Sequence, residues 1–319
     1  MFKKKIHYLI LLFTLNGCVE HVFFINIKPT GNYNINYQCN GNLDDINNFD
    51  FPIPNTPDWE ITNNIKKKND SYFFSANRNF KNNERILTNF SNNDSIPYES
   101  KLKHPLTVKK TNYIFLKLIS FECTFKSRET KYKYPSLSKW LDDPNNDTDN
   151  IIKEILKYII NQSIENANLG FNIYPIIKND INKWFNNQIK HLPDSIIFNN
   201  FENYLTKGSS IIKSNLINDA INIDSLINIY KLEADITMNL IDDDFNFKIK
   251  MPNHIFSHNS DTIINDTLIW QFSIKNFSNN NNNIYAHSYE ILYFNIIIFF
   301  IIIFFVFIFK KNIFFRTIY

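Results

Sequence analysis

The sequence predicts an α+β fold: an antiparallel β-sheet built from N- and C-terminal segments, a helical insertion, and one C-terminal transmembrane helix. Apolar and polar residues alternate near both ends of the chain. Between them, at about 149–221, isoleucines recur at helical spacing. Residues 291–309 are nearly all Ile and Phe. The expected organisation is a signal peptide at 1–17, an extracytoplasmic α+β domain at 18–289, the membrane helix at 291–309 and a short basic tail at 310–319.

The first 17 residues are typical of an export signal. Lys3–Lys5 form a basic start, and Tyr8–Leu15 form an apolar run that is too short to span a bilayer. The run ends in Leu15-Asn16-Gly17-Cys18, which resembles the lipobox of bacterial lipoprotein signals. The resemblance implies that Cys18 is the lipid attachment site and, after cleavage, the mature N-terminus. The alternative is an ordinary secretory signal with a chance cysteine.

Strands are expected on both sides of the insertion. Val22–Gln38 reads as a β-hairpin around Pro29-Thr30-Gly31-Asn32, a composition that favours turns. Thr111–Phe125 is the strongest strand signal in the chain. From Lys231 to Leu240 the alternation has a period of two, which predicts another strand. Further strands are expected in the region 245–289.

Four helices are expected in the insertion. Apolar residues at helical spacing predict them at 151–164, 177–189, 193–205 and, after Gly208, 209–221. In most proteins such apolar faces pack in the core. The more specific alternative is that they line a lipid-binding groove.

The run Ile291–Phe309 has the length and apolar character of a membrane-spanning helix. Lys310, Lys311 and Arg316 follow it, and no acidic residue lies beyond Glu290. The positive-inside rule therefore predicts a cytoplasmic C-terminus, with the bulk of the chain outside and the protein resident in the inner, or cell, membrane. The alternative is a buried core helix or a strand.

The C-terminal region carries a recognisable pattern, formed by Met251-Pro252-Asn253, Asn259, Asn265-Asp266-Thr267 and Ile269-Trp270-Gln271-Phe272. It resembles a pattern near the end of LppM-like bacterial envelope lipoprotein domains, although Asn253 replaces the usual Gly. The resemblance implies a β-rich extracytoplasmic domain followed by a membrane helix. It carries no catalytic residue across. Some relatives are linked to the binding of envelope lipids, and the resemblance implies such a role only through them. The helical insertion is not an expected part of that domain.

Composition and motifs exclude several classes of function. The chain has 34 Lys+Arg against 31 Asp+Glu, and its formal net charge of +3 comes from the two ends, so bulk charge does not favour nucleic acid as a partner. Five glycines form no phosphate-binding loop motif. His254 and His258 have a spacing that metal ligands use, but they lack further ligands. We therefore expect no catalytic, cofactor-binding or metal-binding residues.

The chain has three cysteines, Cys18, Cys39 and Cys123. If Cys18 carries lipid, Cys39 and Cys123 both lie outside the cytoplasm, where an oxidising compartment permits a disulfide between them. The alternative is two unpaired buried thiols that behave as small apolar groups.

Two classes of function stand on the sequence. The first is a non-enzymatic, membrane-anchored lipoprotein that acts as a binding or envelope-assembly module. Its partners would be the membrane, through the lipid anchor and the transmembrane helix, and a lipid or an envelope protein. The second is an exported hydrolase of unrecognised type. A eukaryotic type I membrane protein of the secretory pathway would share the topology of the first.

Overall fold

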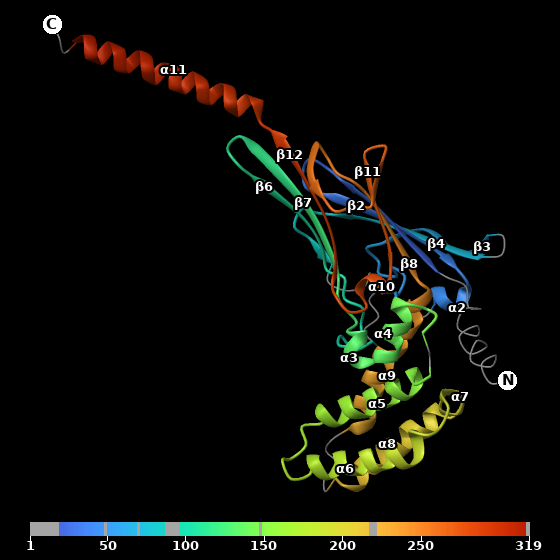
Figure 1. Ribbon diagram of the computed structural model, residues 1–319. Coiled ribbons are helices and arrows are strands. Elements are labelled where there is room, and N and C mark those ends of the chain that lie inside the picture. Colours follow the sequence, from blue (N-terminus) through green and yellow to red (C-terminus); the bar gives the residue numbers. More distant parts are fainter. Residues whose placement is uncertain are drawn as a thin grey trace.

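The structure is a computed structural model that describes residues 19–47, 50–68, 71–86, 96–146, 149–216 and 222–316. The predicted signal peptide at 1–17 and Cys18 lie outside the described residues. Strands form two sheets, and most of the helices gather beyond one end of them (Figure 1).

The first sheet has seven strands and contains both early and late segments of the chain. In spatial order its strands are β10 (Thr262–Ile264), β11 (Thr267–Ser273), β8 (Asp244–Lys250), β1 (Glu20–Ile27), β2 (Tyr33–Gly41), β4 (Ser71–Phe80) and β3 (Glu60–Lys68). The predicted hairpin at 22–38 is confirmed, because β1 and β2 pair antiparallel with Val22 opposite Gln38. Its turn uses Gly31 at φ +86°, a conformation that glycine adopts without strain.

The second sheet has five antiparallel strands. In spatial order they are β5 (Arg85–Ile86), β6 (Leu106–Asn112), β7 (Leu116–Phe125), β12 (Asn282–Ile291) and β9 (His254–His258). The strand predicted at 111–125 is split, because the chain turns at 113–115 and the Tyr113 N–H donates to the Leu116 carbonyl at 2.8 Å.

The two sheets pack against each other through phenylalanine side chains. Phe125 of β7 lies edge-on against three rings of the first sheet. Its ring centroid is 5.1 Å from that of Phe245, 5.8 Å from that of Phe247 and 4.9 Å from that of Phe272. Edge-to-face pairs of this kind add about 0.5–1.5 kcal/mol each beyond the burial of their area. The core between the sheets is therefore aromatic and tightly specified.

The helices that follow β7 form a separate layer beyond the sheets (Figure 1). They are α3 (Thr130–Lys133), α4 (Pro135–Asp142), α5 (Ile151–Glu165), α6 (Tyr174–Trp184), the π-helical turn η1 (Phe185–Ile189), α7 (Asp194–Asn199), α8 (Phe201–Ser214), α9 (Ile223–Asn239) and the 3₁₀ turn η2 (Leu240–Asp242). Two short helices lie elsewhere, α2 (Leu43–Ile46) and α10 (Ile274–Phe277).

The helices predicted at 151–164 and 177–189 are confirmed. The single helix predicted at 193–205 is instead two helices, α7 and α8, which are separated at Asn200. Gly208, however, does not end a helix: it lies inside α8, where a Cβ atom would come within 2.5 Å of Ile160 Cδ1. The glycine therefore allows α5 and α8 to approach closely. Residues 217–221, the end of the fourth predicted helix, lie outside the described residues.

The strand predicted at 231–240 is wrong, because these residues belong to α9 and η2. The alternation of apolar and polar residues there coexists with a helical set, Ile223, Ile227, Ala234 and Thr237, which is buried on one side of α9. The strand interpretation counted Glu233 among the polar residues that alternate with apolar ones, whereas the structure buries its side chain.

The predicted fold class is wrong in two respects, of which the first is the sheet. There are two sheets rather than one, and the first is not purely antiparallel, because β1 and β8 run parallel with Phe23 opposite Phe247. A parallel pair needs a long connection that returns the chain to the same end of the sheet. The helices between β7 and β8 are part of that connection.

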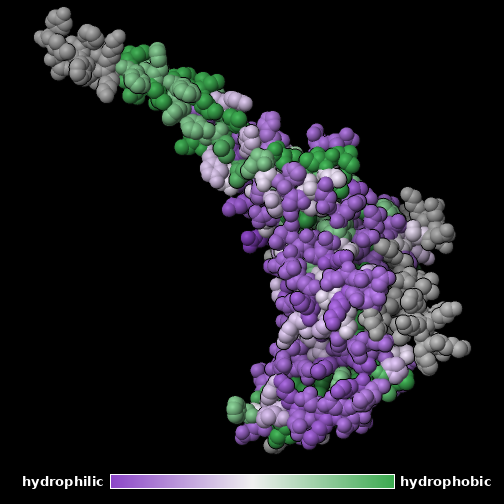
Figure 2. Space-filling model, in the orientation of Figure 1, coloured by the Kyte–Doolittle hydropathy of each residue, from purple (hydrophilic) through white to green (hydrophobic). Residues whose placement is uncertain are grey.

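The second respect is the transmembrane helix expected at 291–309. A helix, α11 (Tyr293–Arg316), projects from the sheets (Figure 1), and most of its apolar side chains along 293–308 are exposed (Figure 2). Among the helices within the described residues, none is both long and apolar enough to cross a membrane. The start of the apolar run belongs to β12 instead, where Ile291 pairs with Leu116.

A buried ion pair joins the helical layer to the second sheet. Arg128, three residues after β7, is 5% exposed, and its Nη2 donates to the Glu233 carboxylate of α9 at 2.8 Å. The same nitrogen donates to the Glu233 carbonyl at 2.8 Å and to Thr237 Oγ1 at 2.7 Å. The Tyr134 hydroxyl donates to the other carboxylate oxygen of Glu233 at 2.8 Å. Both charges are therefore paired and hydrogen-bonded, as burial requires.

We expect Glu233→Leu to lower the free energy of unfolding by about 3–5 kcal/mol, because it leaves the Arg128 guanidinium buried without its carboxylate. The double variant Arg128→Met/Glu233→Leu should recover much of this loss, since it removes both charges. Urea unfolding curves provide the measurement. Glu290→Leu is the matched control, because Glu290 pairs with Lys117 at 3.1 Å in a partly exposed position and should cost about 1 kcal/mol or less. Equal losses for the two single variants would contradict the expectation.

Candidate functional site

A large hollow lies in the helical layer, between α5, the segment from α7 to α8, and α9. It encloses about 590 Å³, a size that suits a small-molecule ligand. Fourteen residues line it: Ile152, Ile155, Phe198, Asn199, Asn200, Phe201, Glu202, Asn203, Lys231, Leu232, Asp235, Ile236, Met238 and Asn239. We call this hollow the helical cleft.

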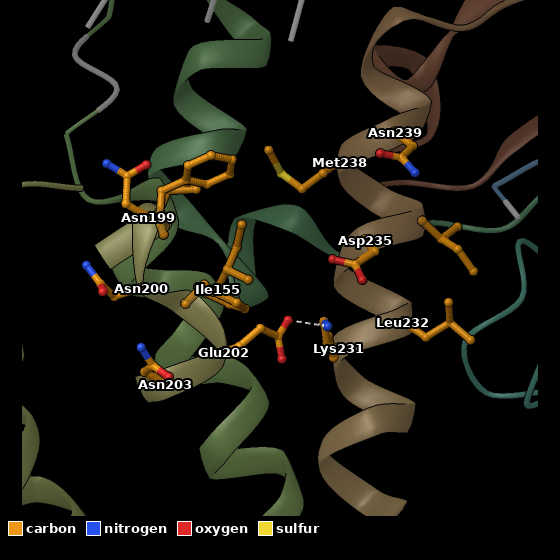
Figure 3. A pocket seen from close by; sticks show the side chains of 14 residues that line it. Ile155, Asn199, Asn200, Glu202, Asn203, Lys231, Leu232, Asp235, Met238 and Asn239 are labelled. Carbon is orange, nitrogen blue, oxygen red and sulfur yellow. Dashed lines mark hydrogen bonds and ion pairs between the residues drawn. The ribbon is translucent and has the colours of Figure 1, made fainter. Parts of the chain in front are cut away.

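The side chains that face each other across the cleft come from three helices. Figure 3 shows Ile155 of α5 and Met238 of α9 turned toward one another, with Asp235 and the pair Glu202–Lys231 beside them. In the same view Asn199, Asn200 and Asn203 turn away from α9. The interior of the cleft is therefore apolar on one side and charged on the other.

Helical spacing explains how α9 serves both the cleft and the sheet junction. Lys231, Asp235 and Met238 lie at positions i, i+4 and i+7 and share one face of the helix. Glu233 lies on a different face, where it meets Arg128. The buried ion pair thus sets the rotation of α9, and that rotation turns the other face toward α5 and α8.

The charges in the cleft are two carboxylates and one ammonium. Lys231 and Glu202 form an ion pair across it (Figure 3). Asp235 is exposed to solvent, yet partial desolvation of its carboxyl raises the pKa above its ordinary value, and nearby Lys231 opposes this rise. An apolar wall beside a partly desolvated carboxylate is suited to holding an amphiphilic molecule rather than a purely polar one.

A smaller hollow of about 240 Å³ lies next to the buried ion pair and is rich in tyrosine and glutamate. Lys133 already occupies its charged side, because Lys133 Nζ lies 3.3 Å from Glu129 Oε2 and 3.4 Å from Glu233 Oε1. Its charges are thus largely compensated within the chain.

A second group of titratable side chains is sealed in the core. His21 is 3% exposed, and its ring nitrogens lie 2.8 Å from the Tyr37 hydroxyl and 3.2 Å from Asp243 Oδ2. Burial lowers the pKa of His21 to about 4, against the opposing charges of Asp50 and Asp244. Burial likewise lowers the pKa of His104 to about 3. Both rings are therefore neutral at pH 7.

Of the site residues predicted from the sequence, Cys39 and Cys123 do not line the helical cleft. Cys18 lies outside the described residues. Cys39 of β2 and Cys123 of β7 are free and buried, in different sheets. Burial raises the pKa of Cys39 to about 12 and moves that of Cys123 in the same direction. Both thiols are thus protonated at neutral pH, as expected of apolar core groups.

His254 and His258 both lie in β9. Within the described ranges, no group of three or more histidine, cysteine, aspartate or glutamate side chains is placed to hold a metal ion. Sequence reasoning identified the apolar faces of these helices and raised a lipid-binding groove among them, but it did not name the residues that line the cleft. The nearest signal was the spacing of Lys231, Asp235 and Met238, which the strand interpretation concealed.

No family model matches the chain, and no curated protein matches it. Among solved structures, the chain is similar to the NMR structure of the folded domain of LppM from Mycobacterium tuberculosis. The match has a TM-score of 0.32 and 7% sequence identity, and it covers 86% of this chain and 90% of that chain. It falls in the group that the C-terminal pattern resembles, but a likeness this low carries no argument about fold or function.

We expect stability to fall as the pH drops from about 6.5 toward 4. The pKa values of His21 and His104 are lower in the folded chain than in the unfolded one, so the unfolded chain binds more protons in this window. Above pH 6.5 these histidines cost no stability. Below it, each of them lowers the free energy of unfolding by at most about 1.4 kcal/mol per pH unit. Urea unfolding at pH 7.5 and pH 5 measures the loss.

His104→Phe should flatten this pH dependence, because it keeps a ring between Phe51 and Phe125, whose centroids lie 5.0 and 5.5 Å away. His191→Gln is the control, since His191 is exposed. An unchanged slope in His104→Phe would show that this histidine does not carry the effect.

Proposed function

We propose that this protein is a non-enzymatic binding module of the cell envelope, and that its helical cleft holds an amphiphilic ligand. The observation that carries the proposal is the cleft itself. It combines about 590 Å³ of space, an apolar wall formed by Ile155, Phe198 and Met238, and a charged side formed by Glu202, Lys231 and Asp235. Ligand sites are typically mostly apolar, with a few placed polar groups that fix orientation.

The charge arrangement favours binding over catalysis. Lys231 and Glu202 engage each other, which makes them orienting groups rather than a free acid and base. The apolar wall can bury an acyl or alkyl chain, which stabilises the complex by roughly 25 cal/mol per Å² of apolar surface removed from water. The charged side then contacts the polar head of the same molecule.

A neutral apolar dye, Nile red, tests the cleft in the full-length chain. We expect a saturable increase in its fluorescence that Met238→Trp abolishes, since the larger ring fills the space between α5 and α9. Met238→Leu is the matched control and should bind as the parent does. Any signal that persists in Met238→Trp belongs to apolar surfaces elsewhere and is subtracted.

Phe198→Asn provides a second variant, because Phe198 is 42% exposed and its loss should leave folding intact. Thermal unfolding of both variants verifies that they fold. Equal dye binding by the parent, Met238→Trp and Phe198→Asn would refute the proposal.

We propose further that Cys18 carries a lipid and tethers the module to the membrane. The support is the lipobox-like Leu15-Asn16-Gly17-Cys18 after an apolar run. Mass spectrometry of the N-terminal peptide of the protein expressed in bacteria should find Cys18 as the first residue, bearing a diacylglycerol group. Cys18→Ser should retain the signal peptide. A mature N-terminus without lipid at another residue would favour ordinary secretion.

A further inference from the structure

The helical cleft carries an excess of negative charge. Its lining contains two carboxylates, Glu202 and Asp235, and one ammonium, Lys231. Because Lys231 pairs with Glu202, the charge of Asp235 is only partly compensated. Within the part of the chain that the structure describes, the Asp235 carboxylate accepts no hydrogen bond of its own.

The surroundings of Asp235 strengthen the effect of this charge. Ile155 faces the carboxylate from α5, and Met238 lies one turn further along α9 (Figure 3). Asp235 itself is exposed to solvent, and partial desolvation of its carboxyl in the cleft raises the pKa above its ordinary value. A charge next to apolar surface is stabilised most by an opposite charge that arrives with its own apolar body.

We propose that the ligand of the helical cleft is an amphiphile with a cationic amine head, whose ammonium pairs with Asp235 while its chain lies against Ile155, Phe198 and Met238. The proposal rests on the binding role proposed above and specifies the class of ligand. An anionic amphiphile of the same length meets the uncompensated carboxylate and is disfavoured. The Glu202–Lys231 pair remains in place and bounds the polar side.

Three probes that share one chain length separate charge from burial. Dodecylamine, dodecanol and dodecanoate, each below its micelle concentration, compete with Nile red for the full-length chain at pH 7.5. We expect dodecylamine to displace the dye at a concentration at least about tenfold lower than dodecanol. Dodecanoate should require a concentration at least about tenfold higher than dodecanol. Only the dye signal that Met238→Trp removes is counted.

The variant Asp235→Asn keeps the shape of the side chain and removes its charge. It should reduce the preference for dodecylamine over dodecanol to less than about threefold and improve competition by dodecanoate. Asp224→Asn is the matched control: it removes an acid from the same helix, outside the cleft, where Asp224 binds Ser209 at 2.6 Å. It should leave the order of the three probes unchanged.

The outcomes separate the two proposals. If Nile red shows no component that Met238→Trp removes, the binding role of the cleft fails, and the ligand class fails with it. If the dye binds in the cleft but the three probes compete equally, or if Asp235→Asn retains the amine preference, the cleft stands and the amine assignment is wrong. A preference for dodecanoate would likewise overturn it.

Discussion

The buried pair of Arg128 and Glu233 is the constraint on which the arrangement of the molecule depends. Arg128 follows β7 almost directly, so the position of its guanidinium is set by the second sheet. Glu233 lies near the middle of α9. Its carbonyl oxygen and one of its carboxylate oxygens, together with the Thr237 hydroxyl, accept hydrogen bonds from that guanidinium. A charge taken out of water must keep its partner. The pair therefore fixes both the position and the rotation of α9 relative to the sheet.

The geometry of the cleft follows from that fixed rotation. Once Glu233 faces Arg128, Lys231 and Asp235 must point toward α5 and α8, because helical residues two apart point in different directions. Gly208 contributes by letting α8 approach Ile160 of α5 closely. The cleft is then the space that α9 leaves between itself and this tightly packed pair. Specific binding groups arise here as a consequence of packing elsewhere.

Much of the local structure could be predicted from the sequence, whereas its assembly could not. Local turn chemistry around Gly31 was sufficient for the first hairpin, and the isoleucine periodicity was sufficient for α5. Residues 231–240 fit two periods equally well, and only the tertiary partner of Glu233 decides between them. The pairing of β1 with β8 depends on contacts more than 200 residues apart, and the cleft combines side chains of several helices. No window of local sequence contains such information.

The short distance between the start of β1 and position 18 has a mechanical consequence. Val19 is 1% exposed, its carbonyl accepts from the Asp244 N–H at 3.0 Å, and β1 begins at Glu20. Since one extended residue spans about 3.5 Å, a lipid on Cys18 would hold the start of β1 close to the membrane surface. The end of the sheet at which β1 begins would then lie at the lipid headgroups. Asn239, at the end of the cleft, lies only five residues before Asp244 in the chain. The end of α9, and with it one end of the cleft, would then lie within a few residues of the anchored end of the sheet.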